Sequence, residues 1–195
     1  MHAHHDAKLS IFSQNAVKQP ESTIRTATNT DLPALSDISK KTYIETYHDE
    51  RFTDELLEKM FGVPALLGDF KNPEMTFILA FDNDKLCGYA KVQLQNDKII
   101  LDKIYLLQTY QRKGLGTQLL NHCFEHALQH QANKMELRVY CENKPAIEFY
   151  KKHGLTHTGT TSYHAANGVI VPDVIHIMTI DDIEARLKNT SRLSL

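Results

Sequence analysis

Cysteine is scarce in this sequence, and its few copies are too widely spaced to share a site. Cys87, Cys123 and Cys141 are odd in number and form no Cys-x-x-Cys pair, so neither a disulfide framework nor a zinc site is indicated. This usage is typical of a reducing compartment, and the N-terminus lacks the charged-then-apolar order of a signal peptide. We therefore expect the protein to be cytoplasmic.

Long apolar runs and an excess of one charge are also absent. No run approaches the roughly 18 uninterrupted apolar residues of a transmembrane helix, so we expect no membrane partner. The 22 basic and 24 acidic residues give a net charge of −2, and we therefore expect no nucleic-acid partner. Any phosphate-bearing ligand must be held by a local arrangement of residues.

The length of 195 residues predicts one domain with extensions. Residues 1–20 carry no sustained periodicity and end at Pro20, so we expect a flexible N-terminal extension. The domain is expected to span residues 21–182, and residues 183–195 are expected to form a C-terminal tail.

Hydrophobic periodicity gives a coarse order of elements along the domain. Alternating apolar residues predict strands, and apolar residues spaced three or four apart predict helices. The predicted strands are 23–28, 75–81, 85–94, 99–107, 134–140, 156–163 and 174–180. The predicted helices are 29–47, 53–61 with a broken helical stretch to 70, 117–131, 144–153 and a turn or two at 181–187. This order predicts an α+β (mixed α/β) fold, with a mixed sheet between helices on both faces.

The most informative segment leads from a strand ending at 104–106 through a loop with two glycines into a helix. Such a helix start directs free N–H groups and a positive dipole end at one point, which suits an anion. Gly114 and Gly116 allow a phosphate to approach the backbone closely, and Arg112 and Lys113 add positive charge. A pyrophosphate fits this arrangement. The alternative is a glycine-softened turn with two solvated basic residues.

Other binding motifs do not fit. A P-loop needs Gly-Lys-Ser/Thr, which does not occur. A dinucleotide fingerprint needs a third glycine where this chain has Leu119. His122, His126 and His130 recur every four residues, but no cysteine or carboxylate spacing supports a metal site, so we expect a partly solvated helix face.

A second informative segment is the helix that follows Asn143. Tyr150 lies two turns after Asn143 on the same face. A tyrosine hydroxyl, with a pKa of about 10, can protonate a departing thiolate whose thiol has a pKa of about 8.5, provided that both are desolvated. The alternative is that Phe149 and Tyr150 form a core aromatic pair and Asn143 caps the helix. Asn143 can serve as both a cap and a ligand contact.

Together these two segments resemble the GNAT superfamily of acetyl-CoA-dependent N-acetyltransferases. The loop matches that family's Q/R-x-x-G-x-G/A signature through Gln111, Gly114 and Gly116. The later helix matches the pattern N-x-x-A-x-x-F-Y-x-x-x-G-F/L at Asn143, Ala146, Phe149, Tyr150, Gly154 and Leu155. The resemblance covers residues 23 to about 180. It implies a central, mostly antiparallel sheet that splays between its fourth and fifth strands.

The resemblance also implies acetyl-CoA as cosubstrate, no metal, and a role for each matched residue. The backbone of Ile104, Tyr105 and Leu106 is expected to pair with the pantetheine arm, which Asn143 also contacts. Tyr150 is expected to act as general acid toward the leaving thiolate and to contact the cofactor. The pyrophosphate is expected to bind the loop and helix start, formed by Gln111, Arg112, Lys113, Gly114, Leu115, Gly116 and Thr117.

The loop departs from the family pattern at two positions. Many members carry Pro at position 108 and Gly at position 112, where this chain has Gln108 and Arg112. We therefore expect the backbone flexibility of the loop to differ, although both glycines that face the phosphates are present.

Candidate residues for the acceptor side are less specific. Asp102 lies on the strand that leads to the cofactor, on the same side as Ile104 by alternation, and is the leading candidate for a base acting through water. Glu45, Asp49 and Glu50 cluster where the resembling fold places its acceptor, and Glu45 and Asp49 are candidate substrate contacts. A solvated acidic helix end is the alternative.

The expected function is acetyl transfer to a primary amine of a small molecule, by direct attack in a ternary complex. The region 43–61 also resembles the helical region of polyamine-acetylating members, and its carboxylates suit a polycation. One alternative is acetylation of a protein N-terminus or lysine. Another is a non-catalytic acetyl-CoA sensor, against which the retention of Tyr150 argues. A homodimer is a further expectation, since late-strand exchange between protomers is common in resembling enzymes.

Overall fold

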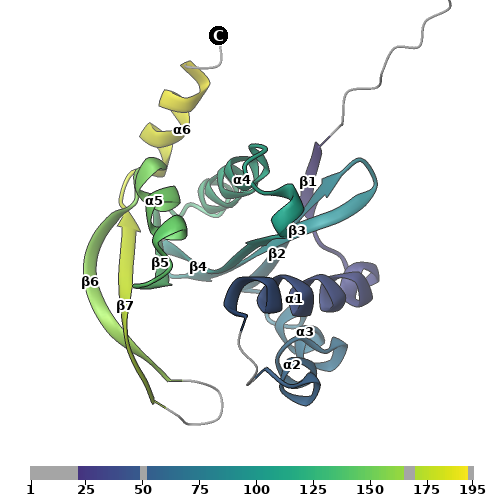
Figure 1. Cartoon of the computed structure of the whole chain (residues 1–195). Helices are drawn as coiled ribbons and strands as arrows, with labels where there is room; N and C mark the ends of the chain where they lie inside the picture. The colour runs from purple at the N-terminus through teal and green to yellow at the C-terminus, as the bar shows by residue number, and fades with distance from the viewer. Residues whose placement is uncertain (1–21, 49–51, 165–169, 193–195) are drawn as a thin grey trace, which may run out of the picture.

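A seven-stranded sheet forms the centre of the molecule (Figure 1). The structure is a computed structural model that describes residues 22–48, 52–164 and 170–192. The strand order is β1-β2-β3-β4-β5-β7-β6, in which β4 and β5 are parallel and the other neighbours are antiparallel. The strands are β1 (Ser22–Thr26), β2 (Met75–Asp82), β3 (Lys85–Gln95), β4 (Lys98–Leu106), β5 (Lys134–Tyr140), β6 (Thr156–His164) and β7 (Ile170–Ile180).

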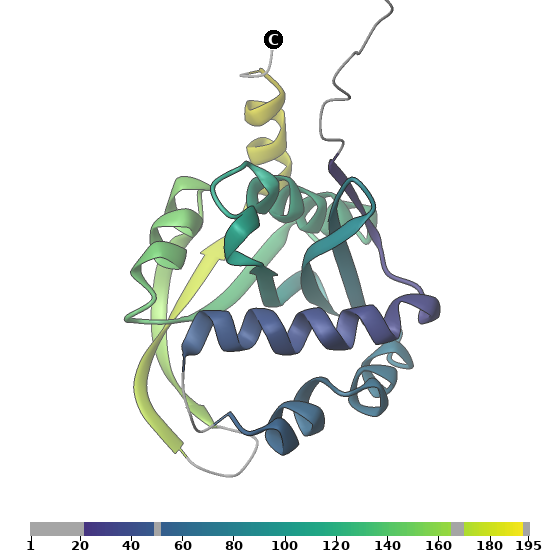
Figure 2. The same cartoon turned by 45° about the vertical axis from the view of Figure 1, so that its right-hand side comes forward.

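Helices cover both faces of this sheet, which confirms the predicted mixed α/β class. In Figure 1, α4 lies over one face and α1 under the other, and Figure 2 shows α1 lying across the sheet with α2 and α3 beside it. The α-helices are α1 (Leu32–Tyr47), α2 (Asp54–Phe61), α3 (Val63–Phe70), α4 (Leu115–Gln129), α5 (Lys144–Lys152) and α6 (Ile183–Arg192). Short 3-10 helices are η1 (Asn29–Asp31) and η2 (Gln108–Tyr110).

The helix starts on the α1 side are set by local capping contacts. Thr28 and Asp31 form a capping box ahead of α1, and Pro33 occupies its first turn, where a missing N–H costs nothing. The Thr53 hydroxyl accepts from the backbone N–H of Leu56 at 3.3 Å, so α2 begins where predicted.

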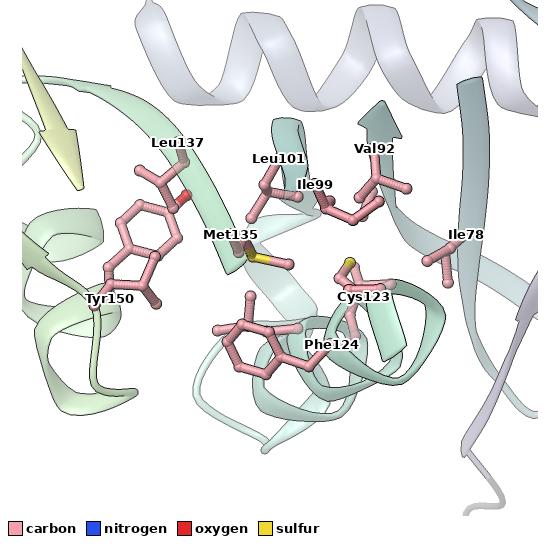
Figure 3. Packing of buried hydrophobic residues seen from close by; sticks show 14 of the residues in the cluster. Ile78, Val92, Ile99, Leu101, Cys123, Phe124, Met135, Leu137 and Tyr150 are labelled. Atoms are coloured by element: carbon pink, nitrogen blue, oxygen red, sulfur yellow. The ribbon is translucent and has the colours of Figure 1, made fainter. Parts of the chain in front are cut away.

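Two apolar clusters hold the helices against the sheet. Apolar residues of α4, including Cys123 and Phe124, are fully buried against Ile99 and Met135 of the strands (Figure 3). On the opposite face, Leu35 of α1 belongs to a cluster with side chains from β2 and β3. The middle of the sheet, at β2 and β3, is therefore covered on both faces.

The β4–β5 pair separates part of the way along the sheet. Their parallel register runs from Lys98 and Lys134 to Leu101 and Leu137. Beyond that point β4 continues to Leu106 beside β3, while β5 continues beside β7. This is the splay between the fourth and fifth strands that the family resemblance implies.

Some predicted boundaries were wrong. Helix α4 begins at Leu115 rather than Thr117, and α6 extends to Arg192, beyond the predicted end near 187. The start of α6 is fixed by a distant residue, because Asn133 accepts from the N–H groups of Ile183 and Glu184. Residues 1–20, Asp49, Glu50 and positions 193–195 of the predicted tail lie outside the described residues. Within the described ranges no helix has the length and apolar character needed to cross a membrane.

Candidate active site

A β-bulge lies where β4 leaves β5. Lys91 of β3 is opposite Lys103 of β4, whereas the next residue, Val92, is opposite Leu101. Asp102 is therefore the extra residue on β4. An extra residue bends a strand and interrupts the alternation of side chains between the two faces of the sheet.

The bulge places Asp102 and Ile104 on different faces. Ile104 packs against the cluster on the α4 side. The Asp102 carboxylate is bonded to Lys91, whose ammonium lies over the ring of Phe77 in the cluster on the α1 side. The prediction that Asp102 shares a side with Ile104 is wrong, because it assumed an uninterrupted ladder.

The contacts of Asp102 bear on its predicted role as a base. Its carboxylate accepts from Lys103 at 2.9 Å and lies 3.2 Å from the Lys91 ammonium. Burial alone would raise the pKa of Asp102, but the two ammonium groups outweigh burial and hold it below its ordinary value. A carboxylate stabilised in this way is a weak base, so the geometry does not favour that role.

The glycine loop ends at the exposed start of α4. Gly114 is the N-cap with φ of +85°, and a Cβ placed there would meet no atom within 4 Å. A Cβ at Gly116 would lie 3.5 Å from Leu106 and 3.6 Å from Phe149. The first intrahelical bond runs from the Gln118 N–H to the Gly114 carbonyl, so the N–H groups before it are available to an anion.

Arg112 adopts a backbone conformation that favours glycine. Its φ is +60°, in the left-handed region. Many members of the resembling family carry glycine at this position, and Arg112 is therefore held in a conformation that its own side chain disfavours. The loop keeps the backbone path of a glycine while presenting a guanidinium group.

Side chains also anchor the loop to its neighbours. The Gln111 side-chain amide donates to the Leu106 carbonyl at 3.1 Å. The Gln108 N–H donates to the Glu45 carboxylate at 2.9 Å, and the Gln108 side chain donates to the Glu45 carbonyl at 3.0 Å. Glu45, a candidate substrate contact, thus fastens α1 to the loop. The Lys113 ammonium lies 5.2 Å from the centre of the Tyr110 ring.

The start of α4 is bonded to the end of α5. The Phe149 carbonyl, which can only accept, lies 2.7 Å from Nδ1 of His153, so Nδ1 carries the proton. Nε2 of the neutral ring then accepts from the Thr117 hydroxyl at 3.0 Å. Burial lowers the pKa of His153, and although the bond to the Phe149 carbonyl opposes this effect, the net pKa lies below its ordinary value, which favours this neutral form.

Helix α5 carries the two remaining cofactor candidates. The Asn143 side chain accepts from the Ala146 N–H at 3.3 Å, so Asn143 is a helix cap, as its alternative interpretation predicted. Tyr150 is buried, and Figure 3 shows its ring beside Leu137 with the hydroxyl end directed toward β5. Burial raises the pKa of Tyr150 well above its ordinary value, so the hydroxyl stays protonated at neutral pH.

Sequence reasoning missed an aromatic cluster near the end of α1. The Tyr47 hydroxyl lies 3.2 Å from the Tyr105 hydroxyl. The centre of the Tyr43 ring lies 4.6 Å from that of Tyr47 and 4.8 Å from that of Phe52. The signal was the spacing of Tyr43 and Tyr47, which places both rings on one helix face. The cluster joins α1 to the part of β4 that lies beyond the splay.

Gly88 was also missed. A Cβ at this position of β3 would lie 2.3 Å from the Leu106 side chain and 2.5 Å from the Tyr105 carbonyl. Glycine is therefore required where β3 supports the end of β4. No local signal distinguishes Gly88, because the requirement arises from a neighbouring strand.

The histidines of α4 show no metal-binding arrangement. The His126 and His130 rings are 4.2 Å apart, and burial lowers the pKa of His126. Across the part of the chain that the structure describes, no three His, Cys, Asp or Glu side chains are arranged to hold a metal ion.

The comparisons with known proteins agree with this geometry. A model of the acetyltransferase (GNAT) family matches residues 32–155. An uncharacterized N-acetyltransferase from the pepI 3′ region of Lactobacillus delbrueckii subsp. lactis is 28% identical over 137 residues, which are 65% of this chain and 79% of that protein.

Two relatives with described acceptors match at similar levels. The spermidine N(1)-acetyltransferase of Thermoplasma acidophilum is 23% identical, over 67% of this chain and 86% of its own. The bS18-alanine N-acetyltransferase of Escherichia coli is 26% identical, over 68% of this chain and 79% of its own. The crystal structure of PaiA N-acetyltransferase from T. acidophilum in complex with coenzyme A has a TM-score of 0.71 at 21% identity, over 83% of this chain and 99% of its own.

Proposed function

The chain belongs to the GNAT acetyltransferase family, and we propose that it transfers the acetyl group of acetyl-CoA to a primary amine of a small molecule. The observation that carries the proposal is the separation of β4 from β5 after Leu101 and Leu137. Tyr150 lies beside Leu137, and the glycine loop follows the end of β4. A thioester held along β4 would therefore have an acid at one end and an anion site at the other.

The proposed cofactor path uses backbone groups first. The freed part of β4, Ile104 to Leu106, pairs with the pantetheine arm and polarises the thioester carbonyl. The N–H groups of Leu115, Gly116 and Thr117 receive the pyrophosphate at the start of α4. The Thr117 hydroxyl is bonded to His153, so Thr117 contributes its N–H rather than its side chain. Arg112 and Lys113 add positive charge at the rim.

The proposed reaction proceeds by direct attack. The neutral amine attacks the thioester carbonyl carbon, the new C–N bond forms, and the C–S bond breaks. Tyr150 donates its hydroxyl proton to the leaving thiolate, and the surplus proton of the amine passes to water, from which the Tyr150 phenolate takes a proton back before the next turnover. Asp102 is not assigned the role of base, because Lys91 and Lys103 neutralise it.

Small amines are the first choice of acceptor, and a polyamine is the first to test, because a spermidine acetyltransferase is among the relatives. A peptide amine is the second candidate. It is favoured by large apolar side chains exposed on α1 and α3, namely Ile44, Tyr47, Val63 and Leu67, and by the similarity to a ribosomal-protein acetyltransferase.

The decisive experiment measures release of the coenzyme A thiol with a panel of acceptors. The panel contains spermidine, simple alkylamines, a peptide with a free α-amine and the same peptide with a blocked α-amine and one lysine. Turnover confined to small amines supports the proposal, and turnover confined to peptides contradicts it. Binding of acetyl-CoA without release for any acceptor would indicate a sensor.

We also propose a cytoplasmic location and a homodimer. Support for the first is that Cys87, Cys123 and Cys141 are all free thiols. The second rests on the family resemblance, and sedimentation equilibrium of the full chain tests it.

A further inference from the structure

A buried ammonium group lies beside the β4 bulge. Lys91 of β3 places Nζ 2.9 Å from the Asp69 carboxylate of α3 and 3.2 Å from that of Asp102, and its side chain is 11% exposed. Lys103 binds the same Asp102 carboxylate from the other side at 2.9 Å. Four charged side chains from α3, β3 and β4 therefore form one connected cluster. The cluster contains Asp102, the extra residue of β4 at the bulge.

The bulge decides which face each following side chain of β4 occupies. With it, Ile104 and Leu106 pack on the α4 side and Tyr105 packs on the α1 side. A shift of register by one residue would exchange these faces, because side chains alternate along a strand. It would also move the backbone N–H and carbonyl groups of this segment by one position.

We propose that Lys91 is a positioning residue, which fixes the register of the cofactor-binding part of β4 by holding Asp102 in the bulge. This inference rests on the proposed function, in which Ile104 to Leu106 pair with the pantetheine arm. Lys91 does not touch the cofactor. Its ion pairs with Asp69 and Asp102 keep the bulge at the point where β5 departs.

The same strand offers a matched control. The ammonium of Lys98 lies 2.7 Å from the Glu136 carboxylate, in the half of β4 that pairs with β5. Each ion pair joins β4 to a neighbouring strand, Lys91 from β3 and Lys98 toward β5. Lys98, however, lies before the splay. Replacing Lys98 removes an ion pair without disturbing the bulge.

The experiment compares Lys91→Met with Lys98→Met in the full chain. Calorimetric titration with coenzyme A should show affinity about 10-fold weaker for Lys91→Met and within about 2-fold of the original for Lys98→Met. The KM for acetyl-CoA should rise similarly in Lys91→Met, while kcat at saturating acetyl-CoA changes less than about 3-fold, because Tyr150 is not displaced. Amide hydrogen exchange at Ile104 to Leu106 should accelerate in Lys91→Met only.

Two further variants test the inference if Lys91→Met does not fold. Lys91→Arg keeps the charge and should retain coenzyme A affinity within about 3-fold. Asp102→Asn keeps the size of the bulge residue but loses its charge, and it should accelerate exchange at Ile104 to Leu106. Unchanged exchange and affinity in Lys91→Met, or in Asp102→Asn if the former does not fold, would overturn the inference. Failure of the unmodified protein to bind coenzyme A would instead contradict the proposed function, and exchange would still test the register.

Discussion

The hydroxyl of Thr117 donates to Nε2 of His153 across 3.0 Å, and this bond joins the two sequence motifs that identify the family. Thr117 lies in the first turn of α4, where the pyrophosphate is proposed to bind, and His153 follows α5, which carries Tyr150. The bond therefore couples the position of the anion site to the position of the proposed acid.

Replacing Thr117 by Val should loosen this junction without changing the shape of the side chain. Nε2 of the buried His153 would lose its partner, at a cost of about 1–3 kcal/mol in the free energy of unfolding. The affinity for coenzyme A should also fall, by more than the smaller fraction of folded protein accounts for. The reason is that the start of α4 becomes free to shift. Thermal unfolding and calorimetric titration of the same preparation measure both effects. Thr117→Ser restores the hydroxyl and should recover them.

The neutral state of His153 makes stability depend on pH. Burial lowers its pKa in the folded protein below the ordinary value of 6.5, so the unfolded chain binds the proton more readily. The contribution of neutral His153 is therefore fully present above pH 6.5 and is lost as the pH falls from there toward the folded pKa. The free energy of unfolding of the original protein should fall over this range more steeply than that of His153→Gln. Equal slopes would show that His153 does not titrate in this way. His126 has a pKa lowered in the same direction, but it is present in both proteins and cancels in the comparison.

A side chain at position 114 should block the anion site. The space around a Cβ at Gly114 is open, so Gly114→Ala creates no clash within the protein itself. Its φ of +85° adds backbone strain, and Gly154, with φ of +90°, provides a control for that strain. Gly114→Ala should weaken coenzyme A binding about 10-fold or more. A loss of this size corresponds to the free energy of roughly one or two good hydrogen bonds. Gly154→Ala should lose similar stability but retain affinity, and equal loss of affinity in both variants would indicate strain rather than an anion site.

Sequence predicted the parts of the fold that depend on nearby residues. The turn between β2 and β3 contains Asn83 with φ of +54°, a conformation that asparagine tolerates, and the strands beside it lie where alternation predicted them. The loop and the α5 helix were found because their spacing is itself the motif. Sequence patterns were therefore sufficient wherever an element is determined by residues close to it in the sequence.

The features that were missed depend on contacts between distant segments. The bulge at Asp102 arises from its register with β3, and strand alternation alone therefore placed this side chain on the wrong face. The requirement for Gly88 comes from the approach of Leu106, and the start of α6 depends on Asn133. The bond between Thr117 and His153 links two helices that are separated by β5 in the sequence. None of these partners can be identified from spacing within one element.

The most direct test of the account is the turnover of Tyr150→Phe with acetyl-CoA and the best acceptor of the panel. Removing the hydroxyl and keeping the ring should lower kcat by about 10²- to 10⁴-fold, the usual span for general acid catalysis. Coenzyme A affinity and the melting temperature should change little, because the ring that packs in the core remains. Turnover equal to that of the original protein, with the chemical step shown to be rate-limiting, would contradict the role of Tyr150 as the acid.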